Sequence, residues 1–281
     1  MKYILLLLTL AGLFSGCQKF ADLYPQHWGS PPAIKPCKID SIYPVEKGDG
    51  AFNTWTAVGI KYNQKGNPVQ LNYSIMMYAL VQFPVYYKYD NKDRLVEIVG
   101  SISDPTFDYL YTAPLHIKYV YEGNSRMPIR DSVYTWYYDD LAEVEDLYYD
   151  EKGRINRVMH RLAKYPFPET YETKYEYDAN GNKQVLQAGD GSTPPAIEYG
   201  NKPSLYSLHP VWQLVHKDFS KNAIKGNVQS YNERGLPVAA DLETLHKYTD
   251  QAFHNPIFLN ITTGHQYSLS HIDYKCAGFV K

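Results

Sequence analysis

The side chains that most often carry out catalysis are present in this chain, but not at the spacings that known catalytic motifs require. There is no glycine-rich phosphate loop, no Gly-x-Ser-x-Gly elbow and no His-Glu-x-x-His pair. His265 and His271 are near each other, but Asp273 is the one carboxylate beside them, which is too little to predict a metal site. We therefore expect no catalytic residue, no metal and no dissociable cofactor.

An acidic run at residues 139–151 is the most strongly charged segment. Its seven acids with no base could offer oxygen ligands to Ca²⁺, but their spacing matches no EF-hand loop. The favoured interpretation is the solvated face of a hairpin. The acids are Asp139, Asp140, Glu143, Glu145, Asp146, Asp150 and Glu151.

Aromatic rings offer a different chemistry, because they can stack on sugars or on the apolar groups of a partner. The chain has 28 tyrosines in 281 residues. Tyrosine favours strands, and its hydroxyl can remain in contact with water while its ring packs against the protein. The alternative is that most of these rings fill the packing faces of a sheet. The candidate binding aromatics are Trp55, Trp136, Tyr137, Tyr138 and Trp212.

One short pattern recurs five times: Tyr, then Asp or Asn, two polar residues, and Gly or Asp. Counting a degenerate copy at Tyr121, the tyrosines at positions 62, 89, 121, 149 and 177 are separated by 27, 32, 28 and 28 residues, and a further copy begins at 231. The residues expected to form the turns are Asn63, Gly66, Asp90, Asp93, Asp150, Gly153, Asp178, Gly181, Asn232 and Gly235.

This pattern predicts β-hairpins. The Asp or Asn side chain accepts hydrogen bonds from the backbone two residues on, and the final Gly takes positive φ and forms a bulge that suits the hairpin twist. A unit of about 28 residues holds two strands and two connections. We therefore expect an all-β fold: an extended antiparallel meander of repeated hairpins, strongly twisted or curled, with few helices. Residues 239–250 are left open between a helix and a strand.

The N-terminus predicts export. One basic residue is followed by an apolar run at 4–14, which is too short to cross a bilayer and fits a signal peptide. The run ends in Ser15-Gly16-Cys17, which resembles the lipobox of bacterial lipoproteins, although Phe14 replaces the usual aliphatic residue. The resemblance implies cleavage after residue 16 and a covalent lipid on Cys17, with several acyl chains that anchor the protein firmly.

The remaining cysteines and the charge limit the other possibilities. Cys37 and Cys276 could form a disulfide in an exported protein, but their separation along the chain leads us to prefer slightly two separate buried thiols. Without residues 1–16, which include Lys2, the chain has 27 basic and 30 acidic residues. This balance argues against nucleic acid as a partner. We expect a tether at 17–36 and one domain at 37–281.

The Tyr-Asp-x-x-Gly-Arg-Ile sequence at 149–155 resembles the YD repeat of RHS-type proteins. Together with the lipobox, it resembles the YD-repeat-like lipoproteins of Bacteroides-type bacteria. Segments 217–222 and 231–237 are similar to the C-terminal half of that group, and the resemblance covers roughly 60–281. It implies an extended β-sheet, placement at the cell surface or in the periplasm, and no known catalytic residues.

Two functions follow as expectations. The favoured one is a cell-envelope lipoprotein of the outer membrane, facing the periplasm or the cell surface, with a non-catalytic binding or structural role. Its partner would be a glycan or another envelope protein, in addition to the membrane that holds its lipid. The alternative is a glycan-acting hydrolase, because the carboxylates of glycosidases often meet only in the folded protein.

Overall fold

The computed structural model describes residues 37–45, 57–76, 80–100, 116–134, 141–163, 169–240 and 269–276. This part of the chain is nearly all β, and none of its helices is long and apolar enough to span a membrane. Several predicted features lie outside the described residues: the signal peptide 1–16, the tether 17–36 with Cys17, and the aromatics Trp55, Trp136, Tyr137 and Tyr138.

The strands are short. In chain order they are β1 (Cys37–Val45), β2 (Ala57–Tyr62), β3 (Pro68–Met76), β4 (Leu80–Tyr89), β5 (Leu95–Gly100), β6 (His116–Tyr121), β7 (Pro128–Tyr134), β8 (Leu141–Tyr149), β9 (Ile155–Leu162), β10 (Thr170–Tyr177), β11 (Lys183–Gln187), β12 (Tyr199–Pro203), β13 (Asn222–Ile224), β14 (Val228–Tyr231), β15 (Pro237–Ala240) and β16 (Leu269–Cys276). A 3-10 turn η3 (Tyr206–Leu208) and a helix α2 (Pro210–Val215) lie between β12 and β13.

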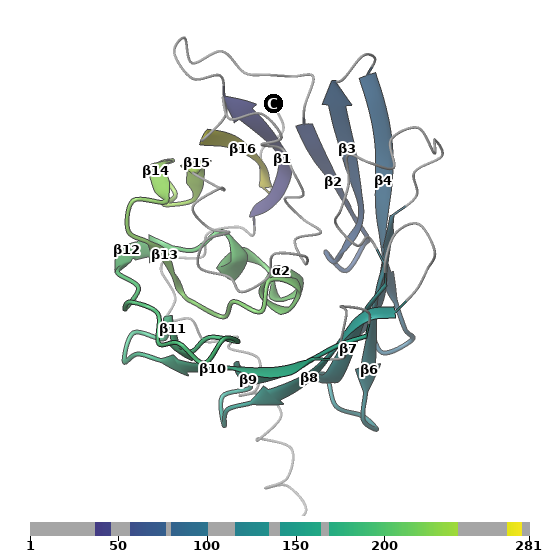
Figure 1. Cartoon of the computed structure of the whole chain (residues 1–281). Coiled ribbons are helices and arrows are strands. Elements are labelled where there is room, and N and C mark those ends of the chain that lie inside the picture. The colour runs from purple at the N-terminus through teal and green to yellow at the C-terminus, as the bar shows by residue number, and fades with distance from the viewer. Residues whose placement is uncertain are drawn as a thin grey trace, which may run out of the picture.

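Fourteen of these strands form one antiparallel sheet, which confirms the all-β class and the antiparallel meander. Strands β1 to β11 are neighbours in chain order. Strand β16 then pairs with β1, so that β15 and β14 extend the sheet on the other side. The sheet curls around α2 but does not close, because β11 and β14 remain as its edges (Figure 1). Residues 237–240, at the start of the segment left open between helix and strand, are β15.

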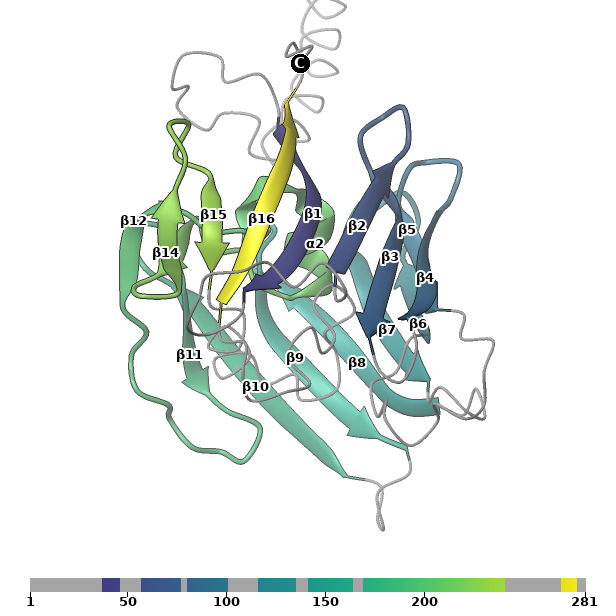
Figure 2. The same cartoon turned by 90° about the horizontal axis from the view of Figure 1, so that it is seen from above.

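A separate two-stranded sheet of β12 and β13 lies between the edge strands β11 and β14 in Figure 1, and Figure 2 also shows β12 beside β14. It is attached to the β10–β11 hairpin by hydrogen bonds. The Asn222 backbone N–H donates to Asn182 Oδ1 at 2.9 Å, and the Lys183 backbone N–H donates to Ser220 Oγ at 3.0 Å. The chain that follows η3 and α2 is therefore tied to the start of β11.

Cys37 and Cys276 form a disulfide that joins β1 to β16. The two residues are directly opposite each other in the antiparallel pair, with Cα atoms 4.0 Å apart. The slight preference for two separate thiols is therefore wrong. That preference assumes that a large separation along the chain keeps the two cysteines apart. Strand β16 instead pairs with β1, which brings residues that are 239 apart in sequence into one cross-strand pair.

The ten residues of the tyrosine pattern form five turns of one geometry. In each turn the residue at the Gly or Asp position donates its backbone N–H to the carbonyl of the Asp or Asn three residues earlier, at 2.8–3.1 Å. Asp93 has φ 60°, which shows that an aspartate occupies the left-handed conformation here in place of glycine. The Asp150 side chain illustrates the cap: its Oδ1 accepts from the backbone N–H of Lys152 and of Arg154, both at 2.9 Å.

A tyrosine precedes each of the first four of these turns, and its side chain contacts a strand that comes earlier in the chain. Its ring is half-buried, and its hydroxyl donates to a backbone carbonyl about 20 residues earlier. Thus Tyr89 bonds Pro68 at 2.7 Å and Tyr149 bonds Pro128 at 2.7 Å, and in each case the acceptor begins the strand after the previous turn. The same bond is made by Tyr62 to Ile39, Tyr121 to Leu95, Tyr177 to Ile155, Tyr199 to Lys183 and Tyr274 to Pro237.

The core lies on the concave face of the sheet, against α2. Trp212 of α2 is 2% exposed and packs edge-on against Tyr87, with ring centroids 5.9 Å apart. Trp212 therefore fills a packing face of the sheet, which is the alternative given for the candidate binding aromatics, and it offers no exposed binding surface. The six-residue helix is too short to be stable alone, and the burial of its large apolar side chains against the sheet is what holds it in place.

Candidate binding site

The turns at one end of the sheet form one wall of a cavity of about 690 Å³, and η3 and α2 form the opposite wall. Four of the ten predicted turn residues line this cavity: Asp93, Gly153, Asp178 and Gly181. The hairpin pattern therefore brings residues from distant parts of the sequence to one site. The other predicted turn residues are not part of the lining.

The cavity is rich in cationic side chains. Lysines recur at the same turn position in three copies of the pattern, and arginines follow two of the turns. Seven cationic residues and two acids line the cavity, and Asp90 and Asp150, which are not part of the lining, pair with two of the arginines. The chain as a whole has a net charge of −2. The cationic residues are Lys65, Lys92, Arg94, Arg126, Lys152, Arg154 and Lys221.

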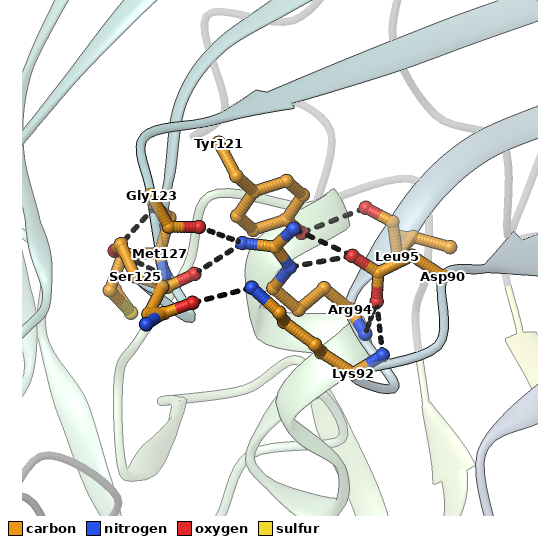
Figure 3. Close-up of polar contacts among 9 residues, drawn as sticks. Asp90, Lys92, Arg94, Leu95, Tyr121, Gly123, Ser125 and Met127 are labelled. Carbon is orange, nitrogen blue, oxygen red and sulfur yellow. Dashed lines mark hydrogen bonds and ion pairs between the residues drawn. The ribbon is translucent and has the colours of Figure 1, made fainter.

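Arg94 shows how the turns position these charges (Figure 3). Its Nε donates to Asp90 Oδ2 of its own turn at 2.7 Å, and one terminal nitrogen donates to the carbonyls of Gly123 and Ser125 in the next turn, both at 3.0 Å. The guanidinium also lies 4.5 Å from the centroid of the Tyr121 ring. One side chain thus joins two consecutive turns and fixes the spacing of the cations.

The opposite wall is mostly apolar. Leu208, Val211 and Leu214 of the η3–α2 segment line the cavity, and so does Phe219. His209 caps α2, because its Nδ1 accepts from the Val211 backbone N–H at 3.1 Å. Burial lowers the pKa of His209 to about 4, so the imidazole is neutral at pH 7 and adds no charge to this wall. The cavity therefore has a cationic side and an apolar side.

A second group of charged residues is buried on the concave face of the sheet, and the sequence did not predict it. Cross-strand partners in register form a row from β6 to β10: Tyr119, Asp131, Glu145, His160 and Tyr171. Within the row, His160 Nδ1 lies 3.1 Å from Glu145 Oε1, and its ring stacks on the Tyr171 ring with centroids 4.3 Å apart.

Lys217, just after α2, extends into this row. Its Nζ lies 3.0 Å from Asp131 Oδ2 and 2.6 Å from Glu145 Oε2, and all three side chains are almost completely buried. Lys217 has φ 49°, a conformation that residues other than glycine rarely adopt, so the two ion pairs hold a strained backbone. Its carbonyl also accepts from Lys183 Nζ at 3.1 Å.

The burial of this row changes the protonation of its members. Burial, followed by the charge of Glu145, raises the pKa of the Asp131 carboxyl well above its usual range. Burial opposes the charge on Lys217, but Asp131 and Glu145 raise the pKa of its ammonium above the ordinary value. For His160, burial is outweighed by hydrogen bonds to Glu143 and Glu145, which raise the pKa of the imidazole to about 9.

The acidic run was therefore interpreted wrongly at two positions. Glu143 and Glu145 are 3% and 0% exposed, so they do not lie on a solvated face. The signal that could have found them is their alternation with the buried Leu147, because residues two apart in a strand share a face. Nothing in the sequence pointed to Lys217 as the partner.

The buried row is arranged as an ion-pair network rather than as a reactive site. Ligand atoms of Glu143, Glu145 and His160 lie within 4.8 Å of one another, which is close enough for a metal ion. However, Lys217 Nζ already contacts Glu145, and the raised pKa of His160 keeps both nitrogens of its imidazole protonated at neutral pH, so neither offers a lone pair to a metal. A glycosidase needs two carboxylates that face a sugar in a cleft, and these are buried. This cluster does not favour the hydrolase alternative.

The remaining predicted pair is only partly described. His271 Nε2 lies 3.1 Å from Asp273 Oδ1 on β16, and the Asp273 side chain is 52% exposed, while His265 lies outside the described residues. An exposed pair of this kind contributes little to stability.

The raised pKa of His160 predicts a stability change at alkaline pH. Its contribution to stability is fully present below pH 6.5, the ordinary pKa in the unfolded chain, and is lost as the pH rises through 9. The unfolding free energy should therefore fall by up to about 3 kcal/mol between pH 7 and pH 9.5. Urea denaturation at several pH values measures this slope, which His160→Gln should reduce. The control His271→Gln should retain the slope, and a His160→Gln slope equal to that of the unaltered protein would contradict the assignment.

Comparison with known proteins gives no family for this chain. No protein-family model matches it, and no curated protein matches it. Among solved structures it is similar to a porin-like protein from Bacteroides uniformis, with a TM-score of 0.44 and 11% sequence identity. The match covers 88% of this chain and 99% of that chain. This degree of likeness assigns neither a family nor a function.

Proposed function

We propose that this protein is a non-catalytic binding protein of the cell envelope, anchored to the outer membrane by a lipid on Cys17. The ligand occupies the cavity between the turns and α2. The observation that carries this proposal is a lining of seven cationic residues and two acids around a cavity of about 690 Å³, in a chain whose net charge is negative. The volume is in the range of sites that take small molecules or part of a larger ligand.

The turn chemistry supports this proposal, because it does not by itself require lysines. The two central turn positions need only residues that tolerate a solvated turn. Lys65, Lys92 and Lys152 nevertheless occupy the same position in three turns, and all three line the cavity. Lys65 pairs with Asp93 of the next turn, but Lys92 and Lys152 have no acidic partner among the described residues. Like charges that are brought close to one another repel, so the placement of these two lysines favours a bound anionic partner.

The tyrosine pattern and the signal sequence supply the rest of the proposal. We propose that the chain is a YD-repeat-like lipoprotein with a repeat of about 28 residues, in which the hairpins serve to align the turns. Envelope placement rests on the apolar run at 4–14 and on the lipobox before Cys17. The partner is a glycan or another envelope component that exposes acidic groups.

The anchor is tested by Cys17→Ala in cells fed an alkyne-labelled fatty acid. We expect the label to be lost and a longer, unprocessed precursor to accumulate, because the acyl chains are attached to this residue. Cys37→Ala is the matched control and should keep the label. A Cys17→Ala chain that is still cleaved and released normally would disprove the anchor.

Binding in the cavity is tested by chemical labelling of lysines on the purified full chain, with and without a cell-envelope extract. Occupancy should lower the acetylation of Lys92 and Lys152 at least threefold, as measured by mass spectrometry of peptides, because the ligand covers their ammonium groups. Lys61 and Lys202 are exposed, do not line the cavity and should react equally in both samples. Equal reactivity of all four lysines would rule out the binding proposal.

A further inference from the structure

We infer that the cavity accepts a small amphipathic anion, that is, a molecule with an apolar body and at least one phosphate or carboxylate group. This inference rests on the proposed function and specifies its ligand class. It follows from the division of the cavity into a cationic wall of turns and an apolar wall of η3 and α2. Each wall selects one half of such a ligand.

The cationic wall has charges that the protein itself does not neutralise. Within the part of the chain that the structure describes, the Lys152 ammonium has no hydrogen-bond or ion-pair partner. Lys92 Nζ donates to Asn124 Oδ1, a neutral amide oxygen, so its charge also remains. Arg94 and Arg154, in contrast, pair with the aspartates of their own turns. The two lysines are thus the groups available to an anion, and the arginines hold the turns in place.

The apolar wall explains why a bare anion is a poorer ligand. Leu208 and Leu214 are only half-buried by the protein and line the cavity. Covering this surface removes apolar area from water, which contributes about 25 cal/mol per Å² of buried area. Inorganic phosphate would form ion pairs with the lysines but would leave the apolar wall exposed to water, whereas an attached alkyl or aryl group would cover that wall.

A neutral sugar fits the lining less well. Sugars are commonly bound by stacking on an open aromatic face, and the lining has two candidates, Tyr121 and Phe219. The Arg94 guanidinium already covers the Tyr121 ring at 4.5 Å, and Phe219 packs against buried residues of the sheet. An acidic group with an apolar body therefore matches the cavity better than an uncharged saccharide.

The test is native mass spectrometry of the full chain, titrated with octyl phosphate while it is held in octyl tetraethylene glycol ether. The detergent has the same alkyl chain with a neutral headgroup, so it serves as an internal competitor. We expect octyl phosphate to bind in its presence, and inorganic phosphate alone to bind at least tenfold more weakly. The Lys92→Glu/Lys152→Glu double variant should bind octyl phosphate at least tenfold more weakly than the unaltered chain.

The matched control is Lys61→Glu/Lys202→Glu, which has the same change of charge at exposed positions outside the cavity and should bind normally. If the charge-reversed variant does not melt like the unaltered chain, Lys92→Gln/Lys152→Gln replaces it. Equal binding by all variants would overturn the inference, and so would equal affinity for inorganic phosphate or no binding of octyl phosphate. If octyl phosphate does not bind but the envelope extract still protects Lys92 and Lys152, the proposed function stands with another ligand class. Failure of both experiments rejects the function as well.

Discussion

A tyrosine hydroxyl that is packed against a sheet must find a hydrogen-bond acceptor, because an unpaired buried polar group costs about 1–3 kcal/mol. In this protein the acceptor is a backbone carbonyl at the start of an earlier strand, and the donor precedes a turn, as in the bond from Tyr149 to Pro128 at 2.7 Å. Each such bond fixes the position of one turn relative to the turn before it. Successive turns therefore align at one end of the sheet, and the cations they carry meet the apolar wall of α2 across one cavity.

Charged residues have two different surroundings in this fold, and the surroundings determine what each group can do. Asp131, Glu145 and Lys217 are buried, and their charges are directed at one another. Such a network adds little net stability over apolar packing, but removal of one partner leaves a buried charge and is strongly destabilising. We infer that the network fixes the position of the α2 segment on the sheet. Lys92 and Lys152 are exposed at the turns, so their charges remain available to a ligand.

The local part of the fold could be predicted from the sequence, because turn chemistry acts over a few residues. The pattern from Tyr149 to Gly153 contains both the residue that caps the turn, Asp150, and the residue that forms the bulge, Gly153. It therefore predicts a hairpin from five consecutive residues alone. The class of the fold and the order of β1 to β11 follow from repeating that unit. The cationic wall of the cavity could also have been anticipated, since lysine recurs at one position of the pattern.

The long-range part of the fold could not be predicted, because it depends on contacts that leave no periodic signal. The pairing of Cys37 with Cys276 requires the last strand to lie beside the first, and no local pattern states this. The helix that carries Trp212 is six residues long, which is too short for an amphipathic period to be recognised. Glu145 was assigned to solvent because charge usually indicates exposure, whereas its partner Lys217 is 72 positions away in the sequence.

The hydrogen bonds of the tyrosine hydroxyls can be tested most directly by removing the hydroxyl and keeping the ring. Tyr89→Phe and Tyr149→Phe should each lower the unfolding free energy by about 1 kcal/mol in urea denaturation, because each removes one hydrogen bond from a half-buried hydroxyl. Tyr148 is the control, since its ring stacks with Arg157 and the residue is 39% exposed. Tyr148→Phe should change stability by less than about 0.5 kcal/mol. Equal losses at all three positions, or no loss at Tyr89 and Tyr149, would contradict the claim that these bonds align the turns.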